Sequence, residues 1–349
     1  MKTFKGVDIN SLSEEQLKLI ITSSTFLKDK YTAQGVFDKL KARLVAGGHL
    51  QDRTIYDNGA SPTANTSSVF MVAAIAATEG RAVATIDFPG AFLHSEMPDD
   101  DKPVLMRLNK FETKVLIAID PSFKQYVLKN GTCVVKLKRA LYGCVESARL
   151  WYEKLSGDLE SVGFTKNKHD MCVFNRIEEN GKQSTLVIHV DDVLVTACSE
   201  AVIDKIIDDI CRMYKSLSVH RGRVLDYLGM TFDYSTIGKC KVTMKQYVSD
   251  LLEFCKDIEG TAKTPASDSL FQVEDNGEIL SSAEKNFFHS VTAKILYLAK
   301  RVRPNLLTAI SFLTKRVTAP YISDLRKLER LVRYVRLHKK AYWIQYHFA

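Results

Sequence analysis

Two short β-rich runs with two aspartates between them constrain the fold of this chain more than any other feature. The runs cover 186–190 and 193–196, and Asp191 and Asp192 separate them. Aliphatic and β-branched residues favour strands, and a two-residue gap between such runs is typical of a hairpin. The sequence therefore predicts an antiparallel hairpin that carries both carboxyl groups at its tip, close to an apolar core.

Adjacent carboxylates near a core repel each other unless a cation neutralises them. Aspartates are also common in ordinary turns, so this pair alone decides little. Asp87 supplies a third acid, because it ends a strand predicted over 82–86. Mg²⁺ takes hard oxygen ligands and keeps waters and substrate phosphates in its other positions. If the Asp87 strand packs beside the hairpin, the three carboxylates suit a pair of Mg²⁺ or Mn²⁺ ions.

Strands dominate the middle of the chain and helices its last third. A helix is expected after Ser13, a hairpin over 26–45 with its turn at Ala33-Gln34-Gly35, a buried helix over 69–77, a strand over 134–137 and an amphipathic helix over 147–162 that stops at Gly163. Helical periodicity recurs over 201–214, 246–255, 283–301, 306–316 and 322–337.

Positive charge is concentrated near the end of the chain. The formal net charge is +8, and between Lys300 and Lys340 twelve Lys and Arg residues face only Asp324 and Glu329. This excess predicts a polyanionic partner, although a solvated helix face gives the same pattern. The seven cysteines have no metal-binding spacing, and no apolar run is long enough to cross a membrane. We therefore expect an intracellular protein, cytoplasmic or nuclear, with no membrane contact.

An ordered set of short motifs extends through most of the chain. It comprises Lys41-Ala42-Arg43-Leu44-Val45-Ala46, Ile86-Asp87 with Ala91-Phe92-Leu93, Lys136-Leu137 with Leu141-Tyr142-Gly143, Trp151-Tyr152-Glu153-Lys154-Leu155, His189-Val190-Asp191-Asp192, Tyr227-Leu228-Gly229-Met230, Ile295-Leu296-Tyr297-Leu298-Ala299 and Arg303-Pro304-Asn305. In this order and spacing the set resembles the reverse transcriptase of copia-type retrotransposons, over roughly 25–346.

The resemblance implies an α+β fold of the right-hand polymerase type, with an antiparallel-sheet palm and a helical C-terminal third. It implies an N-terminal helix or leader at 1–23, fingers and palm at 24–240, a thumb-like helical region at 241–314 and a basic connection segment at 315–349, without a ribonuclease H domain. The implied reaction is two-metal nucleotidyl transfer from a dNTP to a primer 3′-hydroxyl. The implied partners are an RNA template, a DNA primer, a dNTP, and either a second copy or other retrotransposon products in virus-like particles.

Residue by residue, the resemblance implies catalytic and metal-binding roles for Asp87, Asp191 and Asp192. For nucleotide binding it implies Lys41, Arg43, Phe92 and Gly143, and for primer or template binding His189, Val190, Arg303, Arg330 and Arg333. Arg43 suits a triphosphate because its planar fork reaches phosphate oxygens bidentately. Phe92 resembles a gate against a 2′-hydroxyl, with core packing as the alternative. Trp151 and Tyr152 are expected to be core residues.

Departures from the family pattern keep a second hypothesis open. His189 replaces an aromatic residue, Pro89 closely follows Asp87, and 144–148 (CVESA) replaces a segment that usually contains lysine. The loss of that cation and the gain of Glu146 should weaken triphosphate binding. The alternative function is therefore a catalytically decayed or domesticated fragment that only binds nucleic acid. A metal-dependent nuclease or hydrolase that uses the same acids is a third reading.

Overall fold

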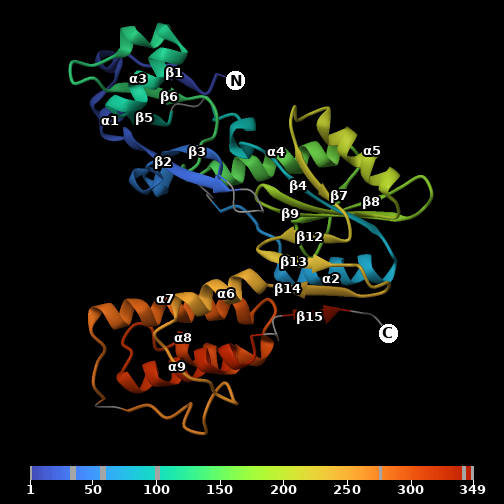
Figure 1. Ribbon diagram of the computed structural model, residues 1–349. Helices are drawn as coiled ribbons and strands as arrows, with labels where there is room; N and C mark the ends of the chain where they lie inside the picture. The colour runs from blue at the N-terminus through green and yellow to red at the C-terminus, as the bar shows by residue number, and fades with distance from the viewer. Residues whose placement is uncertain are drawn as a thin grey trace.

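Figure 1 shows a six-stranded antiparallel sheet on the right, a five-stranded sheet at the upper left and a helical bundle at the lower left. The computed structural model describes residues 2–31, 37–55, 60–98, 103–274, 277–339 and 343–346. The strand order of the central sheet is β11-β4-β10-β9-β8-β7. The fold combines α-helices with sheets in which nearly all neighbouring strands are antiparallel, which confirms the predicted α+β class.

The elements have the following bounds. The central sheet contains β4 (Ala82–Asp87), β7 (Thr165–Lys166), β8 (Val173–Ile177), β9 (Gln183–His189), β10 (Asp192–Ala197) and β11 (Ser218–Arg221). A five-stranded sheet contains β1 (Phe4–Gly6), β2 (Ile21–Tyr31), β3 (Phe37–Ala46), β5 (Leu105–Leu108) and β6 (Cys133–Leu137). A four-stranded sheet contains β12 (Val224–Tyr227), β13 (Met230–Asp233), β14 (Cys240–Thr243) and β15 (Trp343–Tyr346). The α-helices are α1 (Glu14–Lys18), α2 (Thr66–Thr78), α3 (Lys110–Ile119), α4 (Ser147–Ser161), α5 (Glu200–Cys211), α6 (Lys245–Phe254), α7 (Ser282–Ala299), α8 (Leu307–Thr314) and α9 (Ile322–Leu337).

The central sheet is covered on both faces, and this explains the unbroken apolar runs in its strands. Successive side chains of a strand point to opposite faces. Val187 and Leu194 belong to a core with α2 and the four-stranded sheet, whereas Ile188, Val193 and Val195 belong to a core with α4 and α5. Figure 1 shows α4 and α5 on one side of the sheet and α2 on the other. The acid-bearing hairpin is thus held from both sides.

Most elements expected from the sequence are present. Ser13 caps α1 through a capping box with Gln16, and Gly163 follows α4 with φ 90°. The hairpin expected over 26–45 is β2 and β3, but its expected turn at 33–35 lies outside the described residues. The sequence did not predict α3, β5 or β8, because elements of this length show too few periodic positions.

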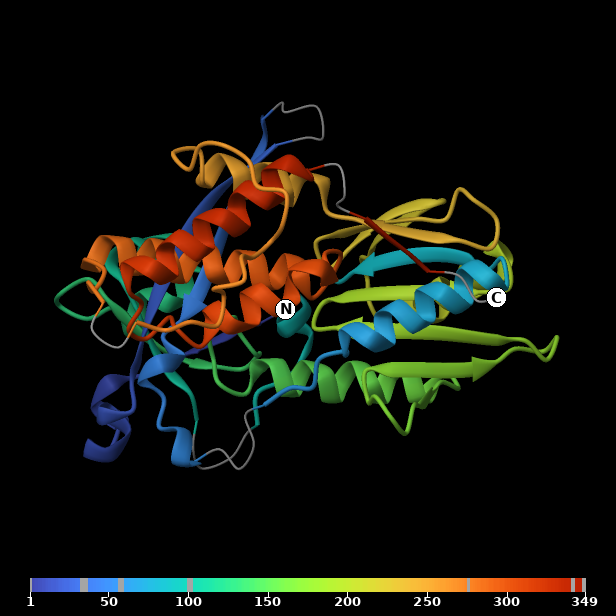
Figure 2. The same ribbon diagram turned by 90° about the horizontal axis from the view of Figure 1, so that it is seen from below.

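The helical bundle continues through α9, as Figure 2 shows from below. Leu328, Leu331 and Val335 of α9 lie in the same core as α7 and α8. The boundary expected at 314/315 therefore falls within this bundle, and the one at 240/241 falls within β14. Among the described residues, no helix is long and apolar enough to cross a membrane.

The buried Asp170 ties the loop before α2 to the loop before β8. Its carboxylate accepts the backbone N–H of Asn65 at 2.9 Å and that of Cys172 at 3.0 Å. Burial by itself would raise the pKa of Asp170, but hydrogen bonds from Ser68, Asn65 and Cys172 outweigh it and hold the pKa below its usual value. The charged form therefore stabilises the folded state.

We expect Asp170→Asn to lower the free energy of unfolding at pH 6 by about 1–3 kcal/mol, because hydrogen bonds to a charged acceptor are lost. A folded pKa below the unfolded one gives stability that is present above the unfolded pKa, about 3.9. That stability is lost as the pH falls through the folded pKa. Urea denaturation of wild type and variant should therefore show a smaller difference at pH 3 than at pH 6. An equal difference at both pH values would contradict this.

Candidate active site

Asp87 and Asp192 face each other across neighbouring strands. β10 lies between β4 and β9, antiparallel to both, and Asp192 is directly opposite Asp87 on one side and His189 on the other. Asp191 precedes Asp192 in the turn, and its carbonyl accepts the N–H of Phe88 at 3.3 Å. The structure therefore brings Asp87 next to Asp191 and Asp192, which lie far from it in the sequence.

The turn of the hairpin is shifted by one residue from the expected Asp191-Asp192. The turn residues are Val190 and Asp191, and Asp192 is already the first residue of β10. Val190 has φ 60°, in the left-handed region that β-branched residues avoid. Such strain persists where the surrounding structure holds the backbone in place, often next to functional residues.

Trp151 is the residue that holds this turn. Its Nε1–H donates to the Val190 carbonyl at 2.7 Å, and its ring packs edge-on against Phe88 and Tyr214. The ring is fully buried, as expected of a core residue. Its hydrogen bond to the turn next to Asp191 was not predicted, and the only signal for it was the place of Trp151 in the family motif.

The three clustered acids dominate the electrostatics of the site. Burial, together with the charges of Asp191 and Asp87, raises the pKa of Asp192 to about 6. Tyr142 donates its hydroxyl to Asp191 Oδ2 at 3.2 Å. Burial and the neighbouring Asp191 raise the pKa of Tyr142 to about 12, so its hydroxyl remains a donor at neutral pH. A divalent cation would relieve the repulsion between the acids.

The carboxylates fit Mg²⁺ by their chemistry. Among the described residues, no group of three or more His, Cys, Asp or Glu side chains is arranged to hold a metal ion as it stands. Mg²⁺ does not need such a cage, because it is usually bound by one or two carboxylates, with waters and substrate phosphates completing its shell. Asp87 and Asp191 supply hard oxygen donors of this kind, with Asp192 beside them.

The β2–β3 hairpin contacts the segment after β6 at Tyr142 and Gly143. Ala46 donates its N–H to the Tyr142 carbonyl at 2.8 Å. Gly143 has φ 97°, and a Cβ at this position would lie 2.1 Å from the Ala46 carbonyl oxygen. Only glycine fits this joint, because other residues would meet both a strained backbone and a clash.

A chain of contacts leads from this joint to the acids. The Arg43 guanidinium carbon lies 5.4 Å from the centroid of the Tyr142 ring, and that ring lies 4.4 Å from the ring of Phe92. Arg43 is exposed, whereas the Phe92 side chain is 7% exposed and belongs to the core that includes α4 and α5. Lys41 lies two residues farther from the joint along β3.

Glu146 does not lie open to a triphosphate pocket, which corrects the expectation drawn from the 144–148 segment. Its side chain is 3% exposed, and its Oε2 accepts Gln51 Nε2 at 3.2 Å. Gln51 Oε1 in turn accepts the N–H of Val145 at 2.8 Å. The acid is enclosed by protein and helps to fix the loop after β3.

The bundle approaches the acids near His189. Burial and the charge of Arg301 lower the pKa of His189, against the opposing effect of Asp191, so this side chain is mostly neutral at pH 7. The Arg301 guanidinium stacks on the Tyr297 ring at 3.5 Å, and the Tyr297 hydroxyl donates to the Leu228 carbonyl at 3.0 Å. Helix α7 and the β12–β13 turn thus lie beside the hairpin.

The three arginines expected to bind primer or template differ in exposure. Arg303 is 2% exposed, and its guanidinium donates to the His338 carbonyl at 3.2 Å and to Asn305 at 3.1 Å. From this buried position Arg303 holds the bundle together, so a direct contact of its side chain with primer or template does not fit the structure. Arg330 and Arg333 are half-buried on α9.

We expect Arg303→Ala to lower the free energy of unfolding by about 3–5 kcal/mol, because it leaves a cavity and buried acceptors without donors. Arg326→Ala is the matched control. Arg326 is exposed on α9 and makes no hydrogen bond or ion pair with the described residues, so its loss should cost no more than about 0.5 kcal/mol. Urea denaturation measures both, and equal values would contradict the structural role of Arg303.

Comparison with known proteins decides the family. A family model described as reverse transcriptase (RNA-dependent DNA polymerase) matches residues 9–266. The chain belongs to the reverse transcriptase family. The chain is 27% identical over 312 residues to the retrovirus-related Pol polyprotein from transposon RE1 of Arabidopsis thaliana, a match that covers 88% of this chain and 19% of the polyprotein.

Other relatives confirm the copia-type resemblance. The Pol polyprotein from transposon TNT 1-94 of Nicotiana tabacum is 24% identical over 310 residues, which cover 85% of this chain and 22% of the polyprotein. A putative transposon Ty5-1 protein of Saccharomyces cerevisiae is 22% identical over 251 residues, 72% of this chain and 75% of that protein. The chain spans about a fifth of the length of the two plant Pol polyproteins.

Among solved structures, a foamy viral protease-reverse transcriptase in complex with double-stranded DNA is similar. It is 13% identical in sequence, with a TM-score of 0.47, and the match covers 88% of this chain and 43% of that chain.

Proposed function

We propose that this reverse transcriptase adds deoxynucleotides to a primer 3′-hydroxyl on an RNA or DNA template. The observation that carries the proposal is the register that sets Asp192 opposite Asp87, with Asp191 beside them in a turn held by Trp151. Asp87 and Asp191 would hold two Mg²⁺ or Mn²⁺ ions, with Asp192 as the third acid. When bound, the ions would supply charge stabilisation at the attacking and leaving oxygens.

The surrounding residues have roles that follow from their contacts. Arg43 binds the triphosphate of the incoming nucleotide, with Lys41 as a second cation on the same strand. Tyr142 keeps the Asp191 carboxylate oriented by its hydrogen bond. Phe92 limits the space beside the nucleotide sugar. Gly143 allows the close contact with Ala46 that positions β3, and thereby Arg43, relative to the acids.

The primer end lies against His189 and Val190 in this proposal. The His189 imidazole is mostly neutral at pH 7, and the Val190 carbonyl accepts the Trp151 N–H. Neither group places a charge next to the acids. The partners are then an RNA template, a DNA primer and a dNTP, inside the cell and together with a second copy or other products of the same element.

Primer extension tests the proposal. Purified protein is incubated with a labelled DNA primer on an RNA template, the four dNTPs and Mg²⁺. We expect extension that EDTA abolishes and that added Mg²⁺ or Mn²⁺ restores. Absence of extension with either metal would overturn the proposal.

Nucleic-acid binding without catalysis is a second candidate. Between Lys300 and Lys340 the chain carries twelve Lys and Arg residues against Asp324 and Glu329, and such a local excess of positive charge favours a polyanionic partner. This candidate predicts tight binding of a primed template that weakens steeply with salt, because phosphate contacts release counterions. Such binding in a preparation that shows no extension would favour it over polymerisation.

We expect Trp151→Phe to slow nucleotide addition by about 10–100-fold while the protein stays folded. Phenylalanine keeps most of the ring contacts but lacks the donor to Val190, so the strained turn relaxes and Asp191 shifts. A displacement of about 1 Å at a reacting group costs roughly 10²-fold in rate. The effect should fall on kcat, with KM for the dNTP nearly unchanged, as measured by steady-state primer extension.

Tyr152→Phe is the matched control for Trp151→Phe. It removes one aromatic donor from the same helix, because the Tyr152 hydroxyl donates to the Met171 carbonyl at 2.8 Å, away from the acids. We expect its kcat to stay within about threefold of wild type, since surface hydrogen bonds are worth only about 1 kcal/mol. Equal losses in the two variants would mean that Trp151 has no positioning role.

A further inference from the structure

A cleft of about 470 Å³ lies on the outer face of the bundle, between α9 and the loop over 256–274. Figures 1 and 2 show this loop on the side of α9 that faces away from the β2–β3 hairpin. The cleft is therefore separate from the acids and from the surface that leads to them. Its volume lies in the range of small-molecule sites and is too small for a nucleic-acid duplex.

Positive side chains outnumber negative ones in this cleft. Lys327 and Arg333, which both line it, are each paired with an acid of α9, at 3.7 Å and 3.2 Å. Arg326 and Arg330 also line it, and neither has an acidic partner among the described residues. Of the described residues that line the cleft, Glu274 alone is acidic. A net positive charge thus remains on one face of α9.

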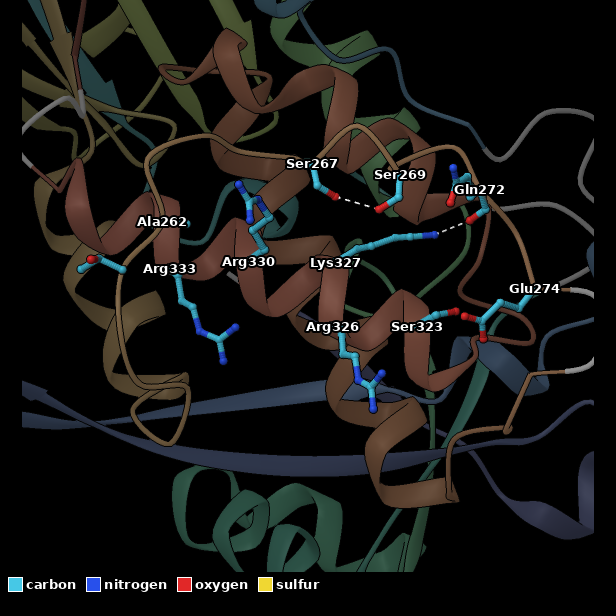
Figure 3. Close-up of a pocket in the computed structure, with 11 residues that line it drawn as sticks. Ala262, Ser267, Ser269, Gln272, Glu274, Ser323, Arg326, Lys327, Arg330 and Arg333 are labelled. Atoms are coloured by element: carbon cyan, nitrogen blue, oxygen red, sulfur yellow. Dashed lines mark hydrogen bonds between the residues drawn. The ribbon is translucent and has the colours of Figure 1, made fainter.

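Hydrogen-bond donors are also in excess here. Arg330 donates to Thr264 Oγ1 at 2.8 Å, but its Nε–H is buried without an acceptor among the described residues. Lys327 and Arg330 extend from α9 toward the loop that carries Ser267 and Ser269, whose hydroxyl oxygens lie 2.9 Å apart (Figure 3). The Thr264 hydroxyl and the Gln272 carbonyl, which accept from Arg330 and Lys327, are neutral. These hydrogen bonds fix the loop to α9 but do not compensate the positive charge.

We propose that this cleft binds an anion that carries two or more phosphate groups a few ångströms apart. Arg326 and Arg330 are four residues apart on a helix, so their Cβ atoms lie about 5–6 Å apart on one face. Figure 3 shows their side chains extending in different directions from α9, so an anion that contacts both guanidinium groups needs more than one phosphate group. Guanidinium groups bind phosphate oxygens bidentately, and serine hydroxyls add neutral donors. Such a group belongs to a free oligophosphate or to the backbone of a single nucleic-acid strand. Either occupant is independent of the nucleotide-adding centre.

Calorimetric titration with inorganic tripolyphosphate tests this site. Omitting divalent cations removes the metal-dependent affinity of the acid centre for the same probe. We expect one site per chain in wild type and a dissociation constant about tenfold or more higher in Arg326→Gln, because one charge-assisted contact is lost. Arg326 makes no bond to the described residues, so this variant should fold normally.

Lys315→Gln is the matched control, since Lys315 is exposed in the same bundle and does not line the cleft. The dissociation constant of this variant should stay within about twofold of wild type, because an exposed charge that does not contact the anion is screened by salt. No binding to wild type, or equal weakening by both variants, would overturn the proposal. Asp191→Asn should bind tripolyphosphate like wild type, so a failure of polymerisation and a failure of this site are distinguishable.

A labelled single-stranded oligonucleotide identifies the source of the phosphates. If tripolyphosphate displaces it and Arg326→Gln weakens its binding, the occupant is a nucleic-acid strand. If neither tripolyphosphate nor Arg326→Gln changes oligonucleotide binding, while Arg326→Gln still weakens the binding of tripolyphosphate, the occupant is a free oligophosphate. Both results support phosphate recognition in the cleft. Independence of both probes from Arg326 overturns it.

Discussion

Asp191→Asn is expected to lower the rate of primer extension by at least about 10³-fold, because a metal-binding carboxylate contributes several kcal/mol and each 1.36 kcal/mol is about tenfold in rate. Asparagine has nearly the same shape and still offers an oxygen to the Tyr142 hydroxyl. The variant therefore removes the charge and leaves the turn in place. Its thermal unfolding should match wild type, since relief of repulsion with Asp192 offsets any loss.

Asp250→Asn is the control for this charge removal. Asp250 is exposed on α6 and lies outside the strands and turn that carry the three acids. Single-turnover extension with Mg²⁺ at saturating dNTP compares the variants without interference from product release. We expect Asp250→Asn to stay within about threefold of wild type, since surface substitutions have small effects. Retention of more than about a tenth of wild-type rate by Asp191→Asn would contradict a metal-binding role, because that loss is only about 1.4 kcal/mol.

Gly143→Ala is expected to be the most damaging change outside the acids. The methyl group would lie 2.1 Å from the Ala46 carbonyl oxygen, at a backbone φ of 97° that alanine rarely adopts. Strain and overpacking together should lower the free energy of unfolding by about 3–5 kcal/mol. β3 must also move away from Tyr142, so Arg43 shifts from the site and KM for the dNTP should rise about tenfold or more, the cost of one charge-assisted contact.

Gly181→Ala separates the clash from the backbone effect. Gly181 also has a positive φ, 75°, but a Cβ there would meet nothing within 4 Å. Gly181→Ala should lower the free energy of unfolding only by the backbone strain, about 1 kcal/mol, and leave KM for the dNTP unchanged. Chemical denaturation and steady-state extension give both quantities for each variant. Equal losses in the two variants would mean that the contact between Gly143 and Ala46 is not a constrained joint.

The strands of the acid-bearing hairpin could be predicted because their composition is unusually clear. Both faces of the central sheet are buried, so β9 and β10 read as unbroken apolar runs with acids between them. The register that sets Asp192 opposite Asp87 could not be read from either run alone. It depends on tertiary packing, and a one-residue slip would turn every side chain to the other face.

Polar residues are where sequence reasoning was weakest. Counting charge treats every cation as solvated, yet Arg303 is buried against the His338 carbonyl. Glu146 was expected to weaken triphosphate binding, whereas its side chain is buried and accepts a hydrogen bond from Gln51. Trp151 was correctly expected in the core, but its hydrogen bond to Val190 depends on a direction that composition does not encode.

Templated addition of one nucleotide tests the three-acid centre most directly. A labelled primer is annealed to an RNA template with a defined next base, and the four dNTPs are supplied one at a time with Mg²⁺. Wild type should extend the primer by one nucleotide with the complementary dNTP, and Asp191→Asn should not extend it under the same conditions. No addition by wild type with Mg²⁺ or Mn²⁺, or equal addition by the variant, would contradict the assignment of these acids.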